Sequence, residues 1–374
     1  MTRVLLIKTS SLGDVIHCLP AVTDMVRNVP GLWLDWMIEE QWAEVVRMHP
    51  GVHRELPVQL RSWRRHPLRP GTWSEFGAFR RQLGYGRYDH IIDAQGLIRS
   101  ALLARLAPGV HSGYDRESVR EPPASYFYDR KYPVSVTLHA AERIRRLAAQ
   151  ALDYPLPPEL DYGLQVQVDR PGWPTANRYL VFLHATARRD KSWGMVRWKA
   201  LALKAAKAGF VVVAPWGTDK ERQRSKELVE AAPGGITPPR LGYRELASLL
   251  AGAAAVVGVD TGLTHLASAV GAPTVALYTA SWSELNGVIG PAFISNLGGP
   301  GTPPSIDDVW AQTQRAIGAG GKQGSWEGGF EPAPELAGHR RFRPSKRRVT
   351  TPAKTRVKVR VRVRRGAPEP GDKD

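Results

Sequence analysis

The chain has 374 residues and a formal net charge of +17 at neutral pH. Its length suits two domains of ordinary size, and a hydrophobic share of 43% supports globular cores. Cys18 is the single cysteine, which excludes an intrachain disulfide. No apolar run reaches the roughly 20 residues that a membrane-spanning helix needs, and strand-like sequence from Arg3 leaves no room for a secretory signal. We therefore expect a cytoplasmic protein, either soluble or attached peripherally to a membrane.

The first half of the chain alternates apolar strands with amphipathic helices. Strands are predicted at residues 4–7, 34–38 and 90–93, and helices at residues 15–26, 74–83, 102–106 and 139–152. Residues 155–174 are rich in proline and indicate a linker between two domains. The pattern predicts an α/β domain with a parallel sheet.

The second half repeats the alternation. Strands are predicted at residues 180–183, 210–214, 256–259 and 274–277, and helices at residues 198–208, 221–231 and 245–251. The fold class expected is therefore α/β, with two Rossmann-like parallel-sheet domains that face a central cleft. The boundaries predicted are domains at 1–153 and 176–318, a linker at 154–175 and a tail at 319–374.

The segment after the first strand contains a candidate catalytic acid. Residues 9–14 are predicted to form a loop that ends in Asp14. Open α/β folds place their chemistry on such loops at the carboxyl edge of the sheet, although Asp14 could equally be a plain helix cap. Gly13 is a lone glycine without the G-x-G-x-x-G pattern, which argues against a nicotinamide-dependent oxidoreductase.

Residues 260–265 carry the strongest local signal, because they follow a buried strand and open a helix. Gly262 permits close backbone approach, and Thr261 and Thr264 are good helix caps. Free N–H groups at the helix start can bind an anion. Asp260 could accept a sugar hydroxyl, and His265 lies one turn further along. This combination suits a sugar-nucleotide diphosphate, with an ordinary strand-to-helix turn as the alternative.

The pattern of strands and helices ends after Gly318, and a basic tail follows. Residues 321–374 contain 15 Lys or Arg and six Asp or Glu, so +9 of the total +17 lies there. A block of like charge is typically disordered and solvated. Its alternation of basic residues with valine could instead form an amphipathic edge strand, with one face formed by Val357, Val359, Val361 and Val363. Nucleic-acid binding is a further reading of the charge, but Phe342 is the only aromatic residue from Arg340 onward.

Several short motifs occur in a fixed order along the chain. They are residues 8–17 (KTSSLGDVIH), 93–97 (DAQGL), 120–122 (REP), 182–186 (FLHAT), 191–193 (KSW), 215–217 (PWG) and 259–265 (VDTGLTH). Together they resemble glycosyltransferase family 9, the lipopolysaccharide heptosyltransferases. The resemblance runs in register from about residue 3 to about residue 316. Residues 93–97 and 120–131 look more like type I than type II of that family.

The resemblance implies a GT-B fold, with the acceptor bound by the N-terminal domain and the nucleotide by the C-terminal domain. It implies an inverting glycosyltransferase that moves L-glycero-D-manno-heptose from ADP-heptose to the Kdo of Kdo2-lipid A in inner-core biosynthesis. A type II enzyme, which adds the second inner-core heptose, is the alternative within the family. A basic nucleic-acid-binding protein is the alternative from another class, and we expect no specific nucleic-acid partner.

The resemblance also assigns roles to particular residues. Asp14 would be the catalytic base, and Lys191 would neutralise the departing diphosphate, although a surface lysine is the plain interpretation of Lys191. Glu221 would bind ribose hydroxyls, or serve only as a favourable acid in a first helical turn. Ala187 stands where the family has a second hydroxyl. The donor-binding residues implied are Thr186, Lys191, Trp216, Glu221, Asp260, Thr261, Gly262 and His265.

The acceptor is expected to contact a second, basic group of residues. The residues implied are Ser10, Gly13, Arg61, Arg64, Arg65, Gln95 and Arg120. Arginine suits carboxylates and phosphates, although a solvated basic loop would explain residues 61–66 as well. Arg65 replaces a lysine of the family with the charge kept. We expect no metal, because there is no D-x-D pair and no histidine ligand spacing, and no cofactor. A monomer held by its tail at the anionic cytoplasmic face of the inner membrane is expected.

Overall fold

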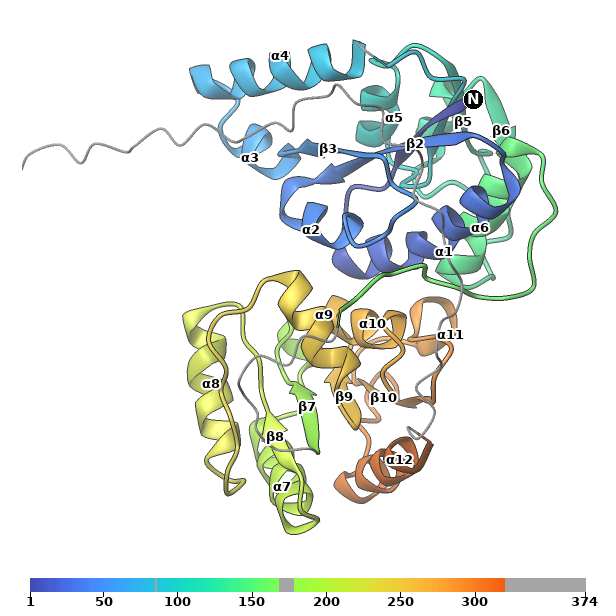
Figure 1. Ribbon diagram of the computed structural model, residues 1–374. Coiled ribbons are helices and arrows are strands. Elements are labelled where there is room, and N and C mark those ends of the chain that lie inside the picture. Colours follow the sequence, from blue (N-terminus) through green and yellow to red (C-terminus); the bar gives the residue numbers. More distant parts are fainter. Residues whose placement is uncertain (85, 168–177, 320–374) are drawn as a thin grey trace, which may run out of the picture. The chain divides into compact units, whose positions relative to one another are not determined.

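The computed structural model describes residues 1–84, 86–167 and 178–319, and these residues form two parallel sheets (Figure 1). The first sheet has the strand order β3-β2-β1-β4-β5-β6, and each neighbouring pair is parallel. Its strands are β1 (Thr2–Ile7), β2 (Leu32–Glu39), β3 (Arg54–Val58), β4 (His90–Asp93), β5 (Val110–Tyr114) and β6 (Arg130–Tyr132). The central strands β1 and β4 have apolar side chains on both faces, as a covered parallel sheet requires.

The second sheet has the strand order β11-β10-β9-β7-β8 and is also parallel throughout. Its strands are β7 (Tyr179–Leu183), β8 (Val211–Val213), β9 (Ala255–Val259), β10 (Thr274–Tyr278) and β11 (Ile294–Gly298). Every residue of β9 and β10 is buried. The carboxyl end of β9 therefore leads directly from the core into residues 260–265.

Helices cover both faces of the first sheet. α1 (Leu12–Asn28) and α6 (Ala140–Leu152) pack together on one face. On the other face, α4 (Pro70–Gly84) and α5 (Ile98–Ala104) bury Phe79, Leu83 and Leu103 against the sheet. The short helices α2 (Ala43–Val46) and α3 (Leu60–Arg65) follow β2 and β3. α1 thus begins at the carboxyl edge of the central strand β1.

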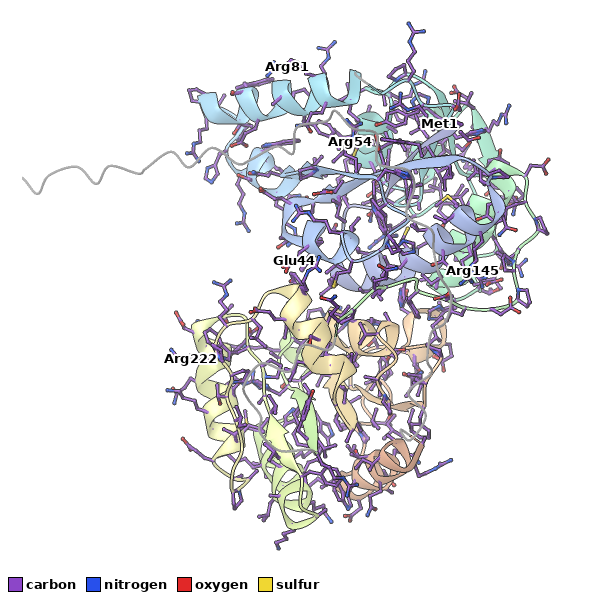
Figure 2. The ribbon with its side chains drawn as sticks, viewed as in Figure 1. Met1, Glu44, Arg54, Arg81, Arg145 and Arg222 are labelled. Carbon is purple, nitrogen blue, oxygen red and sulfur yellow. The ribbon has the colours of Figure 1, made fainter. Side chains whose placement is uncertain are left out.

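A buried ion pair fixes α1 against α6. Arg145 donates from Nε to Asp24 at 2.6 Å, and both side chains are almost fully buried. The same guanidinium donates to the carbonyl oxygens of Pro157 and Glu159 at 2.7 Å each. Figure 2 labels Arg145 beside α6. Because the guanidinium bridges two helices and the following segment, it holds α1 at a fixed position on the sheet.

The second sheet is covered in the same way. α7 (Met195–Lys207), α8 (Asp219–Val229) and α12 (Ile306–Ala319) pack on one face around Trp193 and Trp198. α9 (Tyr243–Ala251) and α10 (Gly262–Ala269) cover the other face, and α11 (Ser283–Asn286) follows β10. The Glu44 carboxylate of α2, labelled in Figure 2, accepts the first N–H groups of α9 from Tyr243 and Arg244 at 3.0 and 3.2 Å. An acid at a helix N-terminus is favourable there.

The predicted elements occur, with two corrections near the site. α1 begins at Leu12, so Asp14 lies in the first helical turn and not in a loop. α5 begins at Ile98, about a turn before the predicted residues 102–106. Four strands and one long helix were not predicted, namely β3, β5, β6, β11 and α12. Part of the linker and nearly all of the predicted tail lie outside the described residues, and no helix within the described residues is long and apolar enough to cross a membrane.

Candidate active site

The first turn of α1 orients the Asp14 carboxylate. Asp14 Oδ2 accepts the backbone N–H of Ser11 at 2.7 Å and the Ser11 hydroxyl at 2.9 Å. The second oxygen, Oδ1, lies 3.7 Å from Lys8 Nζ, and the Asp14 side chain keeps 28% of its surface exposed. The helix-cap interpretation is therefore realised, because the carboxylate satisfies a free N–H at the helix start. It leaves Oδ1 available for chemistry at the same time.

The charge state of Asp14 follows from its neighbours. Burial opposes ionisation of this carboxyl, but the positive charge of Lys8, the hydrogen bonds from Ser11 and the charge of Arg120 outweigh it. The pKa of Asp14 consequently lies below its ordinary value. The group is a carboxylate at neutral pH, which is the form that can accept a proton. Lys8 is itself buried and donates to the Ala94 carbonyl at 3.2 Å.

The segment after β4 holds the neighbouring loop in place. Asp93 is fully buried and accepts four hydrogen bonds, from the N–H groups of Gln95 and Gly96 and from the hydroxyls of Ser100 and Tyr128. Gln95 then accepts the N–H of Thr9 at 3.0 Å and that of Ser10 at 3.3 Å through Oε1. The two adjacent carboxyl-edge loops of the first sheet are thereby tied together beside Asp14.

A cavity of about 620 Å³ opens at this edge of the first sheet. Its lining residues are Ser10, Ser11, Asp14, Gln95, Leu97, Ile98, Arg99, Leu102, Arg120 and Glu121. Four of the predicted site residues, Ser10, Asp14, Gln95 and Arg120, are therefore brought together. The predicted Arg61, Arg64 and Arg65 lie on or at the end of α3, are exposed, and are absent from the cavity lining. Their role in acceptor binding stays a prediction.

Lys191 and Asp260 meet at the carboxyl edge of the second sheet. Lys191 Nζ donates to Asp260 Oδ2 at 2.6 Å, with both side chains about four-fifths buried. The Ser281 hydroxyl donates to the same oxygen. Lys191 is therefore a paired, largely buried cation and not a free surface lysine. The role of Lys191 at a diphosphate stays a prediction.

The turn from β9 into α10 uses its polar residues differently from the prediction. Thr261 occupies the N-cap position, but its side chain forms no capping hydrogen bond. The Thr264 hydroxyl donates back to the Val259 carbonyl at 2.7 Å and is not a cap. A Cβ on Gly262 would lie 2.6 Å from Leu12 of α1, so this glycine allows α10 to approach α1 closely.

The remaining predicted donor residues lie after β7 and β8. Thr186 is partly buried in the segment before Lys191. Trp216 donates through Nε1 to the Pro238 carbonyl at 2.7 Å, and the Arg222 guanidinium lies 5.2 Å from its ring. Glu221 Oε2 accepts the N–H groups of Gly217 and Thr218 at 2.8 and 2.9 Å. Glu221 is thus a capping acid of α8, and ribose binding by its other oxygen stays a prediction.

A group of three histidines joins the two candidate regions, and two of them, His17 and His265, are buried. His265 Nδ1 lies 3.2 Å from His17 Nε2, and the His17 ring packs edge-on against both His265 and His139. Burial lowers the pKa of His265 to about 4 and that of His17 well below its ordinary value, so both rings are neutral at pH 7. A Cβ on Gly13 would lie 3.3 Å from the His265 ring. The α1 turn with Asp14 is therefore in contact with the α10 turn that follows Asp260.

Sequence reasoning missed Lys8, His17, His139 and Ser281 as members of these contacts. Lys8 carried a visible signal, because a lysine closes an otherwise apolar strand. The histidine group had no local signal, since its members come from three distant helices or helix starts. Within the described ranges, no group of three or more His, Cys, Asp or Glu side chains could hold a metal ion.

Comparison with known proteins places this geometry in a family. The family model of glycosyltransferase family 9 (heptosyltransferase) matches residues 76–296. The chain is 47% identical to lipopolysaccharide heptosyltransferase 1 of Pseudomonas aeruginosa over 296 residues, which are 77% of this chain and 81% of that protein. The chain belongs to glycosyltransferase family 9. The resemblance in the sequence motifs is thereby confirmed, and the protein is a glycosyltransferase.

Solved structures extend the family assignment to the fold. Escherichia coli heptosyltransferase WaaC with ADP aligns with a TM-score of 0.78 at 38% identity, covering 84% of this family 9 chain and all of that one. WaaC with ADP-2-deoxy-2-fluoro heptose aligns with a TM-score of 0.76 at 37% identity, covering 84% and 99%. E. coli heptosyltransferase II aligns at 20% identity with a TM-score of 0.67, covering 85% and 98%, and shows the fold alone. The predicted fold class, two parallel-sheet α/β domains of the GT-B type, is confirmed.

Proposed function

We propose that the chain transfers one L-glycero-D-manno-heptose from ADP-heptose to the Kdo of Kdo2-lipid A in lipopolysaccharide inner-core biosynthesis. The observation that carries this proposal is the match to WaaC, which was solved with ADP and with an ADP-heptose analogue, at 37–38% identity over 84% of the chain. The similarity to a heptosyltransferase 1 at 47% identity supports the first heptose as the product. The type II alternative rests on the fold alone and is not favoured.

The proposed reaction is a single displacement with inversion. The Asp14 carboxylate takes the proton of an acceptor hydroxyl, and that oxygen bonds to the anomeric carbon of the heptose. The bond from the anomeric carbon to the diphosphate oxygen breaks, and ADP leaves with the electron pair. In inverting glycosidases a carboxylate likewise acts as general base on a water molecule, whose place is taken here by the acceptor hydroxyl. Oδ1 of Asp14, which lies 3.7 Å from Lys8 Nζ on a residue that lines the cavity, is the atom suited to this role.

The departing diphosphate needs positive charge and N–H donors. Lys191 supplies a positioned cation, and Asp260 holds it in place through the 2.6 Å hydrogen bond. The α10 start at Thr261 and Gly262 supplies backbone N–H groups. Thr186 is assigned to phosphate, and Trp216 with Glu221 to the adenosine. His265 completes the donor site from the α10 side.

The acceptor is assigned to the cavity beside Asp14. Arg120 offers a guanidinium to the anionic groups of Kdo2-lipid A, while Ser10 and Gln95 shape the adjoining wall. Gly13 leaves room where a side chain would meet His265. Arg61, Arg64 and Arg65 form an outlying basic segment for acceptor phosphates. When the polar part of the acceptor binds near Asp14, its reacting hydroxyl lies against the Asp14 carboxylate, which is the proposed base.

Ligand-dependent melting tests the donor assignment. ADP-heptose and ADP should raise the melting temperature of the full chain, because a ligand that binds only the folded state stabilises it by mass action. UDP-sugars and NAD should give no shift. The matched variant Lys191→Ala should lose most of the ADP shift. Stabilisation by UDP-heptose or UDP as strong as that by ADP would contradict the proposed donor.

Membrane contact is part of the proposal, with the tail beyond the described residues as a tether. Residues 321–374 carry +9 of the net charge, and each basic residue near an anionic leaflet contributes about 1 kcal/mol, screened by salt. Truncation after Gly318 should leave melting and turnover on a delipidated acceptor intact. It should weaken binding to anionic vesicles, most visibly at low ionic strength. Unchanged vesicle binding, or failure to fold, would exclude the tail as a separate tether.

A further inference from the structure

The α3–α4 hairpin, residues 60–84, is a firmly anchored projection of the first domain. Phe79 and Leu83 are buried in the core beneath the sheet. The Trp63 ring packs against Phe76 and Phe79 with centroid distances of 5.7 and 5.9 Å. Trp63 also donates through Nε1 to Glu75 at 2.9 Å, which ties α3 to α4. These packed and hydrogen-bonded side chains hold the hairpin in place on the first domain. In Figure 1, α4 lies farther from the sheet than α3.

The end of this hairpin presents two large apolar side chains to solvent. Leu68, between the two helices, is 90% exposed, and Trp73, in the first turns of α4, is 66% exposed. Leu68 is the most exposed of the large apolar side chains in the described part of the chain. One such residue alone is ordinary on a protein surface. Two within six residues, on an element whose other aromatic side chains are packed, indicate a surface that meets something apolar.

A dense positive charge surrounds the two apolar side chains. The hairpin contains six arginines and one acid, and the acid is Glu75, already bonded to Trp63. The arginines are Arg61, Arg64, Arg65, Arg69, Arg80 and Arg81, and all six are exposed. None of them has an ion-pair partner among the described side chains. Figure 2 shows Arg81 on the outer side of α4.

We propose that the α3–α4 hairpin docks on the surface of an anionic lipid bilayer, with Leu68 and Trp73 inserted at the level of the head groups. Arginine forks bind lipid phosphates in pairs of hydrogen bonds. Tryptophan is enriched at membrane–water interfaces, and an apolar edge flanked by cations is the composition of interfacial helices. A soluble polyanion would use the arginines and leave Leu68 and Trp73 without a partner. Charge and apolar surface together therefore select a bilayer.

This inference rests on the proposed function in one respect, since a lipid-linked acceptor brings the enzyme to a membrane. It goes further by assigning the docking to a folded element of the first domain, separate from the tail. The hairpin follows β3 in the same sheet whose carboxyl edge carries Asp14. A docked hairpin would hold that sheet close to the lipid surface from which the acceptor projects.

Vesicle binding of the full chain tests the hairpin without any acceptor present. The vesicles contain phosphatidylglycerol and phosphatidylcholine, and the salt is about 0.5 M so that attraction to the charged tail is screened. Leu68→Ser with Trp73→Ser should weaken partitioning by about tenfold or more, because the inserted apolar area is lost. The control is Val196→Ser with Trp282→Ser, which removes side chains that are 82% and 65% exposed elsewhere. The control should bind like the unaltered chain.

Fluorescence quenching gives a second readout that does not depend on affinity. Acyl chains labelled with bromine should quench the unaltered chain more than Trp73→Phe, because Trp73 is the tryptophan that reaches the lipid. Attachment by the tail alone would give equal quenching in both proteins and would overturn the proposal. So would unchanged vesicle binding in the Leu68 and Trp73 double variant. If the vesicle-binding and quenching results are as expected but the protein does not transfer heptose, the proposed function is contradicted and the docking surface is still supported.

Discussion

At the scale of a single residue, Asp14 is the proposed catalytic base. Asp14→Asn keeps the size of the side chain and an oxygen for the Ser11 N–H, but it cannot take a proton. We expect kcat to fall by ~10²–10⁴, the range for a lost general base, with ADP-heptose affinity little changed. Steady-state kinetics with a delipidated acceptor measures both quantities.

Glu245 supplies the matched control for this substitution. It occupies the same third position of α9 and accepts the Gly242 N–H at 2.7 Å, as Asp14 does for Ser11 in α1. Glu245→Gln removes a capping charge away from the Asp14 cavity and should leave kcat unchanged. Near-normal turnover in Asp14→Asn, or an equal loss in both variants, would reduce Asp14 to a helix cap.

Lys191 is the second residue on which the account depends. Lys191→Ala should lower kcat/KM. The corresponding rise in activation free energy should be roughly 2–4 kcal/mol, comparable to the loss of one donor to a developing oxyanion. Lys204→Ala is the control, because Lys204 forms a surface ion pair with Asp307 at 3.0 Å in the same domain. Its effect on kcat/KM should be negligible. Turnover should also survive EDTA; its abolition by EDTA and recovery with a divalent ion would contradict charge relief by Lys191 alone.

Gly262 acts at the scale of elements, where α10 meets α1. Gly262→Ala places a Cβ 2.6 Å from Leu12, so the helices must separate. The free energy of unfolding should fall by about 1–3 kcal/mol, as in other overpacked contacts. Adding Leu12→Gly, which also removes the Leu12 Cβ that the new side chain meets, should cost less than the sum of the two single changes. Gly318→Ala, in α12 with no atom within 4 Å of the new Cβ, is the control and should not destabilise. Additive losses in the double variant would show that the two residues do not meet.

The elements differ in how far sequence alone determines them. β4 was predicted at its observed residues, because Ile91 and Ile92 form a short apolar run, and both are buried in the structure. β3 contains Arg54, Glu55 and Pro57, and β5 contains Ser112 and Gly113, so neither has the apolar run that identified the other strands. The start of α1 was placed late because Ser11 and Asp14 both favour caps. The choice between them is decided by the observed hydrogen bonds.

The contacts of the candidate site also differ in how far the sequence alone predicts them. Asp14, Gln95 and Arg120 were predicted and line one cavity, whereas Lys191 and Asp260 were predicted separately and form a direct pair. The contact of His17 with His265 spans 248 positions of sequence. No local pattern reports such a contact, because it depends on how two complete sheets bring their helices together. Similarly, the role of Gly262 follows from Leu12 and not from the turn in which it was found.

At the scale of the whole molecule, buried histidines should make folding sensitive to acid. Burial lowers the pKa of His49, His184 and His265 to about 4 each. Each of these histidines binds fewer protons in the folded state than in the unfolded state. The free energy of unfolding is therefore highest above the unfolded-state pKa of about 6.5, and it falls as pH drops from there toward about 4. Within that pH range, each histidine lowers the free energy of unfolding by about 1.4 kcal/mol for each pH unit. Asp24 and Asp93, whose pKa burial raises, act in the opposite sense at lower pH.

Melting temperatures between pH 7.5 and 5 measure this dependence. His49 forms hydrogen bonds through both ring nitrogens, to Thr23 and from the Gly51 N–H, so its neutral form is the one the fold uses. His49→Gln should flatten the decline, and His66→Gln, at an exposed position, should not. A melting temperature that stays constant from pH 7.5 to 5 would contradict neutral burial of these rings.

Transfer to a defined acceptor tests the central claim most directly. The full chain is incubated with ADP-heptose and Kdo2-lipid A, and the lipid is analysed by mass spectrometry while released ADP is measured. The account predicts that the acceptor gains the mass of one heptose, that ADP appears in equal amount, and that the new linkage is inverted. An acceptor that already carries the first heptose should not be extended. Extension of that acceptor with no reaction on Kdo2-lipid A would contradict the account.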